Sequence, residues 1–161
     1  MKHLTVIALL SCGLFMASCS KDSEPPGTNA GSGSVSAKVN GQAWSSKNDA
    51  SGAIFVESQG THSLQAIGAD NSFISVLVPV SIASGQTYTT DNDAISAQYK
   101  TSFQGADTYA ALFGLGSGTI TFSVYNSDRV KGTFEFTGVK FDANGNQTEI
   151  KVEDGVFDIE L

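Results

Sequence analysis

The stretch "TITFSVYN", residues 119–126, carries the clearest secondary-structure signal in this chain. Apolar and polar side chains alternate along it, which is the period of a β-strand with one buried face and one wet face. The predicted inward residues are Ile120, Phe122 and Val124, and the predicted outward residues are Thr119, Thr121, Ser123 and Tyr125. The stretch therefore predicts a half-buried strand in an antiparallel sheet.

The same alternation recurs on both sides of this strand, whereas helical periodicity is almost absent. At the end of the chain, "VFDIEL" (156–161) places Phe157, Ile159 and Leu161 inward and Asp158 and Glu160 outward. Further strands are expected at residues 35–39, 42–46, 53–58, 63–69, 73–78, 94–100, 108–113, 130–141 and 147–153. "FISVLV" (73–78) is apolar on both parities, which predicts a central strand that is covered on both sides.

Turn residues separate these runs. The expected turns are Asn40-Gly41, Gln59-Gly60, Asp70-Asn71, Asn144-Gly145 and Asp154-Gly155. Such pairs supply the positive φ that tight hairpins require, and short strands at roughly 8–12-residue spacing are typical of all-β domains. We therefore expect one all-β domain over residues 35–161, an antiparallel β-sandwich or partly closed barrel of roughly nine to eleven short strands.

One strand contains a break in parity. In "VKGTFEFTGVKF" (130–141) the inward set Val130, Phe134 and Phe136 gives way to Val139 and Phe141. A β-bulge with one extra residue shifts the parity in this way. The pattern predicts a bulge around Thr137-Gly138.

A resemblance extends over nearly the whole domain. The phrases that carry it are "VNGQAW", "GQTY" followed eleven residues later by Tyr99, "GTITF", "GTFEF" and the closing "GVFDIEL". In order and spacing they are similar to a family of small Bacteroidota lipoproteins that contain a domain of unknown function. The resemblance implies a lipid-anchored β-sandwich, and it brings no catalytic residues to transfer.

The first 34 residues differ in character from the domain. Residues 1–18 resemble a lipoprotein signal peptide, because their apolar run is shorter than the roughly twenty residues that a membrane-spanning helix needs. "MASC" (16–19) resembles the lipobox in which Cys is acylated, so Cys19 is the expected lipidation site, with an N-acyl and an S-diacylglyceryl group. Two or more acyl chains anchor a protein stably to a membrane. The alternative is an unlipidated Cys19 beside an ordinary cleavage site.

Residues 19–34 are expected to be the lipidated N-terminus and a Ser-, Gly- and Pro-rich linker that cannot form a core. Ser20 after the cysteine favours the cell outer membrane, on either its periplasmic face or the cell surface. After removal of the expected signal peptide, which contains Lys2, eight basic and sixteen acidic side chains remain, so the formal charge is −8. This charge excludes nucleic acid as an expected partner, and it leaves the lipid as the expected membrane contact.

The sequence contains few residues that could serve as catalytic bases, nucleophiles or metal ligands. His62 is the only histidine after the signal peptide, and Cys12 would leave with that peptide, so a zinc site would lack its usual ligands. His62 is expected to be a solvated turn residue, and no G-x-S-x-G motif offers a nucleophile. "GLGSGT" (114–119) lacks the last glycine and the helix of a phosphate-binding loop. No metal and no cofactor are therefore expected.

Calcium is the remaining metal to weigh. Asp142, Asn144, Asn146 and Glu153 occupy positions 1, 3, 5 and 12 of a loop that is similar to an EF-hand loop. However, Gln147 replaces the turn glycine and strands flank the segment, so a plain hairpin is favoured. "TDND" (90–93), with Asp91 and Asp93, is a second acidic segment. For this segment a solvated turn is favoured over a calcium site still more strongly.

Aromatic side chains offer another route to binding. Trp44, Tyr88, Tyr99, Tyr109 and Tyr125 could stack on sugars or contact a protein, with Trp44 and Tyr125 the chosen contact candidates. Core packing is the competing interpretation for all five. Two functions remain open at this point: a non-catalytic module that binds an envelope protein or glycan, and a polysaccharide hydrolase that uses paired carboxylates.

Overall fold

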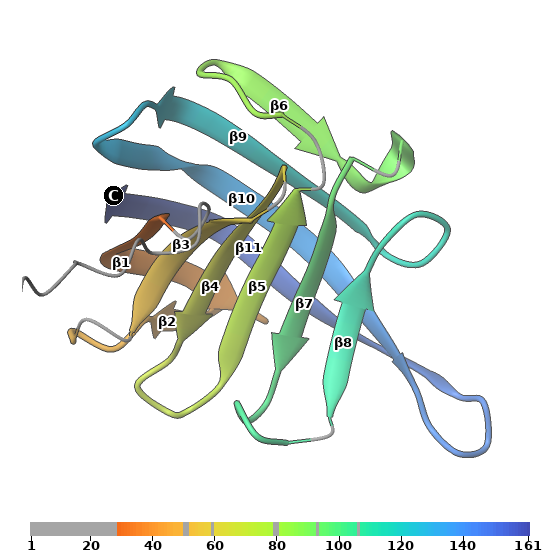
Figure 1. Cartoon of the computed structure of the whole chain (residues 1–161). Helices are drawn as coiled ribbons and strands as arrows, with labels where there is room; N and C mark the ends of the chain where they lie inside the picture. Colours follow the sequence, from red (N-terminus) through yellow and green to blue (C-terminus); the bar gives the residue numbers. More distant parts are fainter. Residues whose placement is uncertain (1–28, 50–51, 59, 79–80, 93, 106) are drawn as a thin grey trace, which may run out of the picture.

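The computed structural model describes residues 29–49, 52–58, 60–78, 81–92, 94–105 and 107–161. They form eleven β-strands and one 3₁₀ turn, η1 (Thr90–Asn92), which confirms the all-β class (Figure 1). The strands are β1 (Asn29–Val39), β2 (Gln42–Ser45), β3 (Ala53–Ser58), β4 (Thr61–Ile67), β5 (Phe73–Val78), β6 (Gln86–Thr89), β7 (Ser96–Lys100), β8 (Thr108–Ala111), β9 (Ser117–Tyr125), β10 (Arg129–Phe141) and β11 (Gln147–Glu160).

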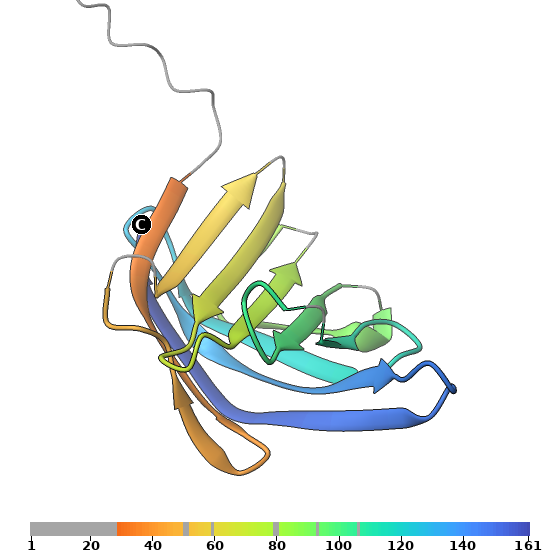
Figure 2. The ribbon, with the colours of Figure 1, turned by 90° about the horizontal axis from the view of Figure 1, so that it is seen from below.

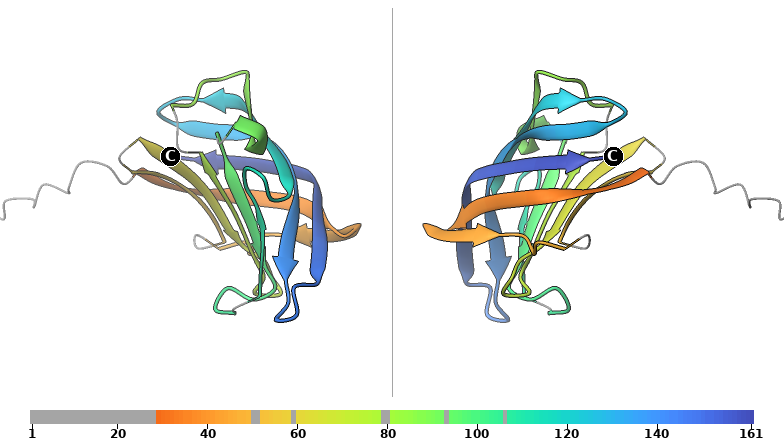
Figure 3. Two further views of the ribbon diagram at one scale, coloured as in Figure 1. Left: turned by 90° about the vertical axis from the view of Figure 1, so that its right-hand side faces the viewer. Right: turned by 90° about the vertical axis from the view of Figure 1, so that its left-hand side faces the viewer.

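All strand pairs are antiparallel, and the sheet curls back on itself. The order is β11-β1-β3-β4-β5-β7-β8-β10-β9-β6, with β2 beside β1 and a further pairing of β10 with β11. β8 meets β10 through one ladder pair, Ala110 opposite Val139. The result is a partly closed barrel, and Figures 2 and 3 show how the long strands β10 and β11 bend around it.

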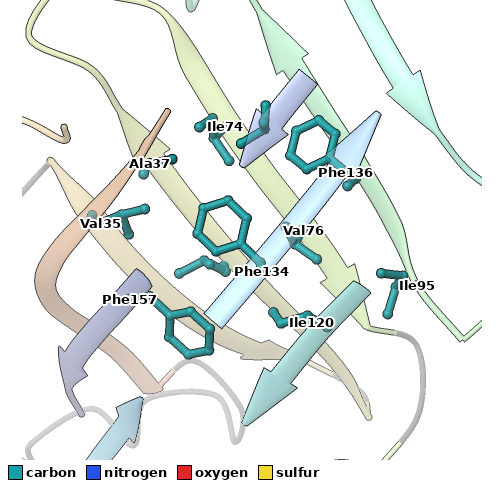
Figure 4. Close-up of a cluster of buried hydrophobic side chains, with 14 of the residues drawn as sticks. Val35, Ala37, Ile74, Val76, Ile95, Ile120, Phe134, Phe136 and Phe157 are labelled. Carbon is teal, nitrogen blue, oxygen red and sulfur yellow. The ribbon is translucent and has the colours of Figure 1, made fainter. Parts of the chain in front are cut away.

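The core lies between two walls of this curled sheet. Phe122 of β9 packs edge-on against Phe55 of β3 at 6.2 Å and Phe157 of β11 at 5.6 Å between ring centroids. Figure 4 shows Phe134 and Phe136 directed at the same interior as Val76. A fully buried side chain of this size contributes about 1.5–3 kcal/mol, so these aromatic contacts hold the walls together.

β9 contains a bulge at Ser123. Phe122 pairs with Gly132, but the next pair joins Val124 to Lys131, which leaves Ser123 as an extra residue. Beyond the bulge the parity is reversed, so Tyr125 packs against the core instead of facing solvent. The predicted alternation therefore holds for Ile120 and Phe122 and is wrong for Val124 and Tyr125.

A second bulge lies within β11. Phe134 pairs with Gly155 and Phe136 with Val152, so two residues of β11, Glu153 and Asp154, stand opposite one residue of β10. Asp154 takes a left-handed conformation with φ of 52°. The expected turn at Asp154-Gly155 is therefore wrong, because β11 runs through it as one bulged strand.

The expected bulge at Gly138 is also wrong. The β10–β11 ladder is uninterrupted from Phe136 to Phe141, with Gly138 opposite Ile150. Val139 points to the other face of the sheet, where it is buried beside Ala110 of β8, and Phe141 is 54% exposed. The parity break in the sequence thus reflects a second contact face of β10 and not an extra residue.

Several boundaries differ from expectation. β1 begins at Asn29, six residues before the expected start of the domain at residue 35, and β6 was not expected. β5 is central, between β4 and β7, but its outer face is covered only in part. Phe73 packs against Phe103 at 5.3 Å, whereas Leu77 is 38% exposed.

Candidate functional site

Two hollows share the outer face of β9, β10 and β11. The first, of about 300 Å³, is lined by Thr89, Asp91, Ser117, Gly118, Thr119, Glu135, Phe136, Thr137, Lys151, Val152 and Glu153. The second, of about 460 Å³, is lined by Thr119, Thr133, Phe134, Glu135, Asp154, Gly155 and Val156. Because Thr119 and Glu135 line both, we describe the two hollows together as the outer groove.

Strand register explains which side chains line the outer groove. Thr89 of β6 faces Thr119 of β9, and Thr119 faces Glu135 of β10. The β11 bulge stands opposite Glu135 and exposes both Glu153 and Asp154. Side chains that are directly opposite on one face of a sheet lie about 5 Å apart at Cβ. The fold therefore gathers hydroxyl and carboxylate groups from four strands.

The groove is polar and predominantly negative. Asp91, Glu135 and Glu153 line it together with one cation, Lys151. Among the residues that the structure describes, none of these four side chains takes part in an ion pair, whereas Asp154 pairs with Lys38 at 2.8 Å. Such a surface favours ligands that carry hydroxyl or amino groups over ligands that carry negative charge.

Trp44 lies away from this groove and inside the protein. It is 7% exposed, and its Nε1 donates to Ser72 Oγ at 2.6 Å. Ser72 Oγ in turn donates to Asp70 Oδ1 at 2.5 Å. A Cβ atom on Gly68 would collide with all three of these groups. The burial contradicts the expectation that Trp44 is a ligand contact, and indicates a structural hydrogen-bond network.

The tyrosines are mainly packing residues. Tyr99 is 7% exposed, and burial raises its pKa. Tyr88 and Tyr109 are half-buried against the core. Tyr125 is packed against the core as well, and its hydroxyl donates to Glu57 Oε2 at 3.1 Å. Burial, reinforced by the bond to Glu57, raises the pKa of Tyr125 to about 12, so Tyr125 is not the exposed contact residue that was expected.

His62 is not a solvated turn residue. It belongs to β4, is 4% exposed, and stacks on Phe55 with ring centroids 5.9 Å apart. Burial lowers its pKa, and the nearby Glu57 opposes this effect. The expectation of a turn residue is wrong because β4 begins at Thr61, so His62 is a strand residue with its side chain on the buried face.

The calcium-loop residues do not come together. Asp142, Asn144 and Asn146 lie in the β10–β11 turn, where Asp142 Oδ1 accepts bonds from the amides of Asn144 and Asn146, both at 2.8 Å. Glu153 lies six residues into β11, about 20 Å along an extended strand. Within the described ranges, no group of three or more His, Cys, Asp or Glu side chains could hold a metal ion.

Sequence reasoning did not find the outer groove. Glu135 was not singled out, and Glu153 was considered only as a calcium ligand. The sequence pattern that could have indicated the groove is the position of Thr119, Thr133 and Glu135, which all lie on the outward face of neighbouring strands. Asp93 and Cys19, named as an acidic-turn residue and as the lipidation site, lie outside the described residues.

Comparison with known proteins gives one result. The model of a family described as "Domain of unknown function (DUF6252)" matches residues 31–158. No curated protein and no solved structure matches the chain. A search of the described residues for a helix that is long and apolar enough to cross a membrane finds none.

Proposed function

Because this chain belongs to the DUF6252 family, whose function is unknown, we propose a function from its own residues: a lipid-anchored, non-catalytic envelope module that binds a protein or glycan in the outer groove. The observation that carries the binding role is the groove itself. It joins two hollows across β9, β10 and β11, and it exposes three carboxylates that form no ion pair within the described ranges.

The lipid anchor is supported by the sequence around Cys19. The apolar run before it is short, the residues 16–19 resemble a lipobox, and the mature chain would contain no other cysteine. The anchor would place the protein at the cell outer membrane, on its periplasmic face or at the cell surface. Since β1 begins at Asn29, residues 20–28 separate Cys19 from the sheet, a span of at most about 35 Å.

The non-catalytic assignment is supported by the environment of the reactive side chains. His62, the only histidine after the expected signal peptide and so the only imidazole that could act as a base, is 4% exposed and packed among aromatic rings. It does not line the outer groove. A binding role requires only hydrogen-bonding groups on an accessible face, which the groove provides.

Crosslinking in intact cells tests the binding role. A photoreactive amino acid at Glu135 should capture an envelope protein or glycan, and the same group at Ser127, in the exposed β9–β10 turn, serves as the matched control. Capture from position 135 alone supports the proposal. Equal capture from both positions, or capture from neither, would refute groove binding.

Cell fractionation tests the anchor separately. Wild-type protein should incorporate a palmitate analogue and sediment with outer membranes, whereas Cys19→Ala should do neither. Loss of lipid at about 0.8 kcal/mol per buried CH₂ removes the membrane affinity. A variant that still sediments, or an unlabelled wild type, would refute the anchor without touching the groove.

A hydrolase remains the second candidate, because Asp91, Glu135 and Glu153 share one hollow. Glycoside hydrolysis requires two carboxyl groups on opposite sides of the scissile bond. Incubation with envelope polysaccharide should release no reducing ends under the binding proposal. Release that is lost in Glu135→Gln and in Glu153→Gln would establish the hydrolase instead.

A further inference from the structure

Within the described ranges, one buried polar side-chain atom has no hydrogen-bond partner, and it belongs to His62 of β4. His62 Nδ1 is fully covered and forms no hydrogen bond with any residue that the structure describes, and the side chain as a whole is 4% exposed. Glu57 Oε2 lies 3.9 Å from Nδ1, which is beyond hydrogen-bond distance. Unpaired buried polar groups are uncommon in folded proteins, so this one requires an explanation.

The groups around His62 come from three strands. Glu57 lies opposite His62 in the β3–β4 ladder, and Val78 lies opposite it in the β4–β5 ladder. Phe55 stacks on the imidazole, and Tyr125 of β9 meets it edge-on at 5.7 Å. Among the described residues, the charged and titratable groups that face His62 are therefore Glu57 and Tyr125.

Glu57 connects the two walls of the barrel through this cluster. Its Oε2 accepts the bond from the Tyr125 hydroxyl, which links β3 to the end of β9. The same oxygen is the one that faces His62 Nδ1. Glu57 also pairs with Asn29, the first residue of β1. The contact between Glu57 and Tyr125 therefore lies next to the start of β1.

We propose that His62, Glu57 and Tyr125 form an acid-sensitive latch: neutral His62 leaves Glu57 bonded to Tyr125, and protonated His62 breaks this link and loosens the β3–β4 hairpin from β9. A proton on Nδ1 places a positive charge 3.9 Å from Glu57 Oε2 and makes Nδ1 a donor that competes with the Tyr125 hydroxyl. The imidazolium is also enclosed by Phe55 and Tyr125, which disfavours a buried charge.

The direction of the pH effect follows from burial. Burial lowers the pKa of His62 below 6.5, so the unfolded chain binds this proton more readily than the folded one. Stability is therefore unaffected by His62 well above pH 6.5 and is lost as the pH falls through the interval between the two pKa values. At pH values below both pKa values, each unit of difference between the folded and unfolded pKa raises the unfolding equilibrium constant about tenfold.

NMR titration of the full chain tests the first step. The chain contains two histidines, His3 and His62, and His62→Gln identifies their signals. His62 should titrate below 6.5. Glu57→Gln should lower this midpoint further, because it removes the charge that favours the imidazolium, whereas Glu160→Gln, the matched exposed control, should leave it unchanged. A midpoint at or above 6.5, or equal effects of both variants, would overturn the latch.

Hydrogen exchange tests the release itself. Wild type and His62→Gln are compared at one acidic pH, so that intrinsic exchange rates are equal. Amides of β3, β4 and the end of β9 should exchange faster in wild type, while those of the β10–β11 turn should not differ. Equal exchange everywhere would overturn the proposal. So would a rise in melting temperature with Zn²⁺ at neutral pH that His62→Gln abolishes, because it would identify a metal site.

Discussion

Tyr125 lies opposite Val130 in the β9–β10 ladder, and both side chains pack toward the core. This pairing exists because Ser123 is an extra residue that reverses the parity of the last part of β9. Without the bulge, Tyr125 would lie on the outer face of the sheet. With it, the Tyr125 hydroxyl crosses the barrel to Glu57 of β3.

Tyr125→Phe should therefore destabilise the protein while the ring contacts remain. Loss of one hydrogen bond typically lowers the free energy of unfolding by about 1 kcal/mol. Tyr109→Phe is the matched control, since its hydroxyl has no hydrogen-bond partner in the described part of the chain, and it should change the free energy by less than about 0.5 kcal/mol. Urea denaturation measures both. Equal effects of the two variants would contradict the cross-barrel bond.

The alternation of side chains was enough to predict much of the sheet. β3 and β5 have the predicted bounds, and β10 extends from the predicted strand by one residue. The bulges could not be predicted in the same way. Ser123 resembles any outward residue of a strand, and Asp154-Gly155 satisfies the chemistry of a turn and of a bulge alike, because both require positive φ at one residue.

The outer groove and the burial of His62 depend on pairings that the sequence does not specify. Glu135 becomes a neighbour of Glu153 only because β10 and β11 pair with a bulge opposite Glu135. His62 is buried because β4 starts one residue before it and β9 supplies Tyr125 from far along the chain. Local patterns predict which face a residue occupies, and the strand order determines what it meets there.

Gly155→Ala tests the close approach of β10 and β11 at the second bulge. A Cβ atom at Gly155 would come within 2.4 Å of the Phe134 carbonyl oxygen, so the strands would have to separate. Overpacking of this kind costs about 1–3 kcal/mol. Asp154→Gly is the matched control, because glycine adopts its φ of 52° without strain and the ion pair with Lys38 that is lost is solvent-exposed. It should lower the free energy of unfolding by less than about 1 kcal/mol, and a larger loss than for Gly155→Ala would argue against this bulge.

Ser72→Ala tests the network beneath Trp44. Ser72 is fully buried and accepts the bond from Trp44 Nε1, so its loss leaves a buried donor without a partner. The expected cost is about 1–3 kcal/mol in the free energy of unfolding. Trp44 is the only tryptophan of the chain, so its fluorescence reports this site directly during urea denaturation. Ser102→Ala, at an exposed loop position, should have little effect. Similar midpoints for both variants would show that the network does not stabilise the fold.

Calcium should not stabilise the protein, although the sequence of residues 142–153 is similar to a calcium loop. The oxygens of Asp142 already accept three hydrogen bonds, two from backbone amides and one from the Asn146 side chain at 2.9 Å. These bonds lower the pKa of Asp142, and a calcium ion would have to replace them. A ligand at a hundred times its dissociation constant adds about 2.7 kcal/mol of stability, which would raise the melting temperature by several degrees. Thermal unfolding with and without millimolar calcium should show no such rise, and Asp142→Ala should melt lower to the same extent in both solutions. A calcium-dependent rise that Asp142→Ala abolishes would show that the β10–β11 turn rearranges to bind the ion.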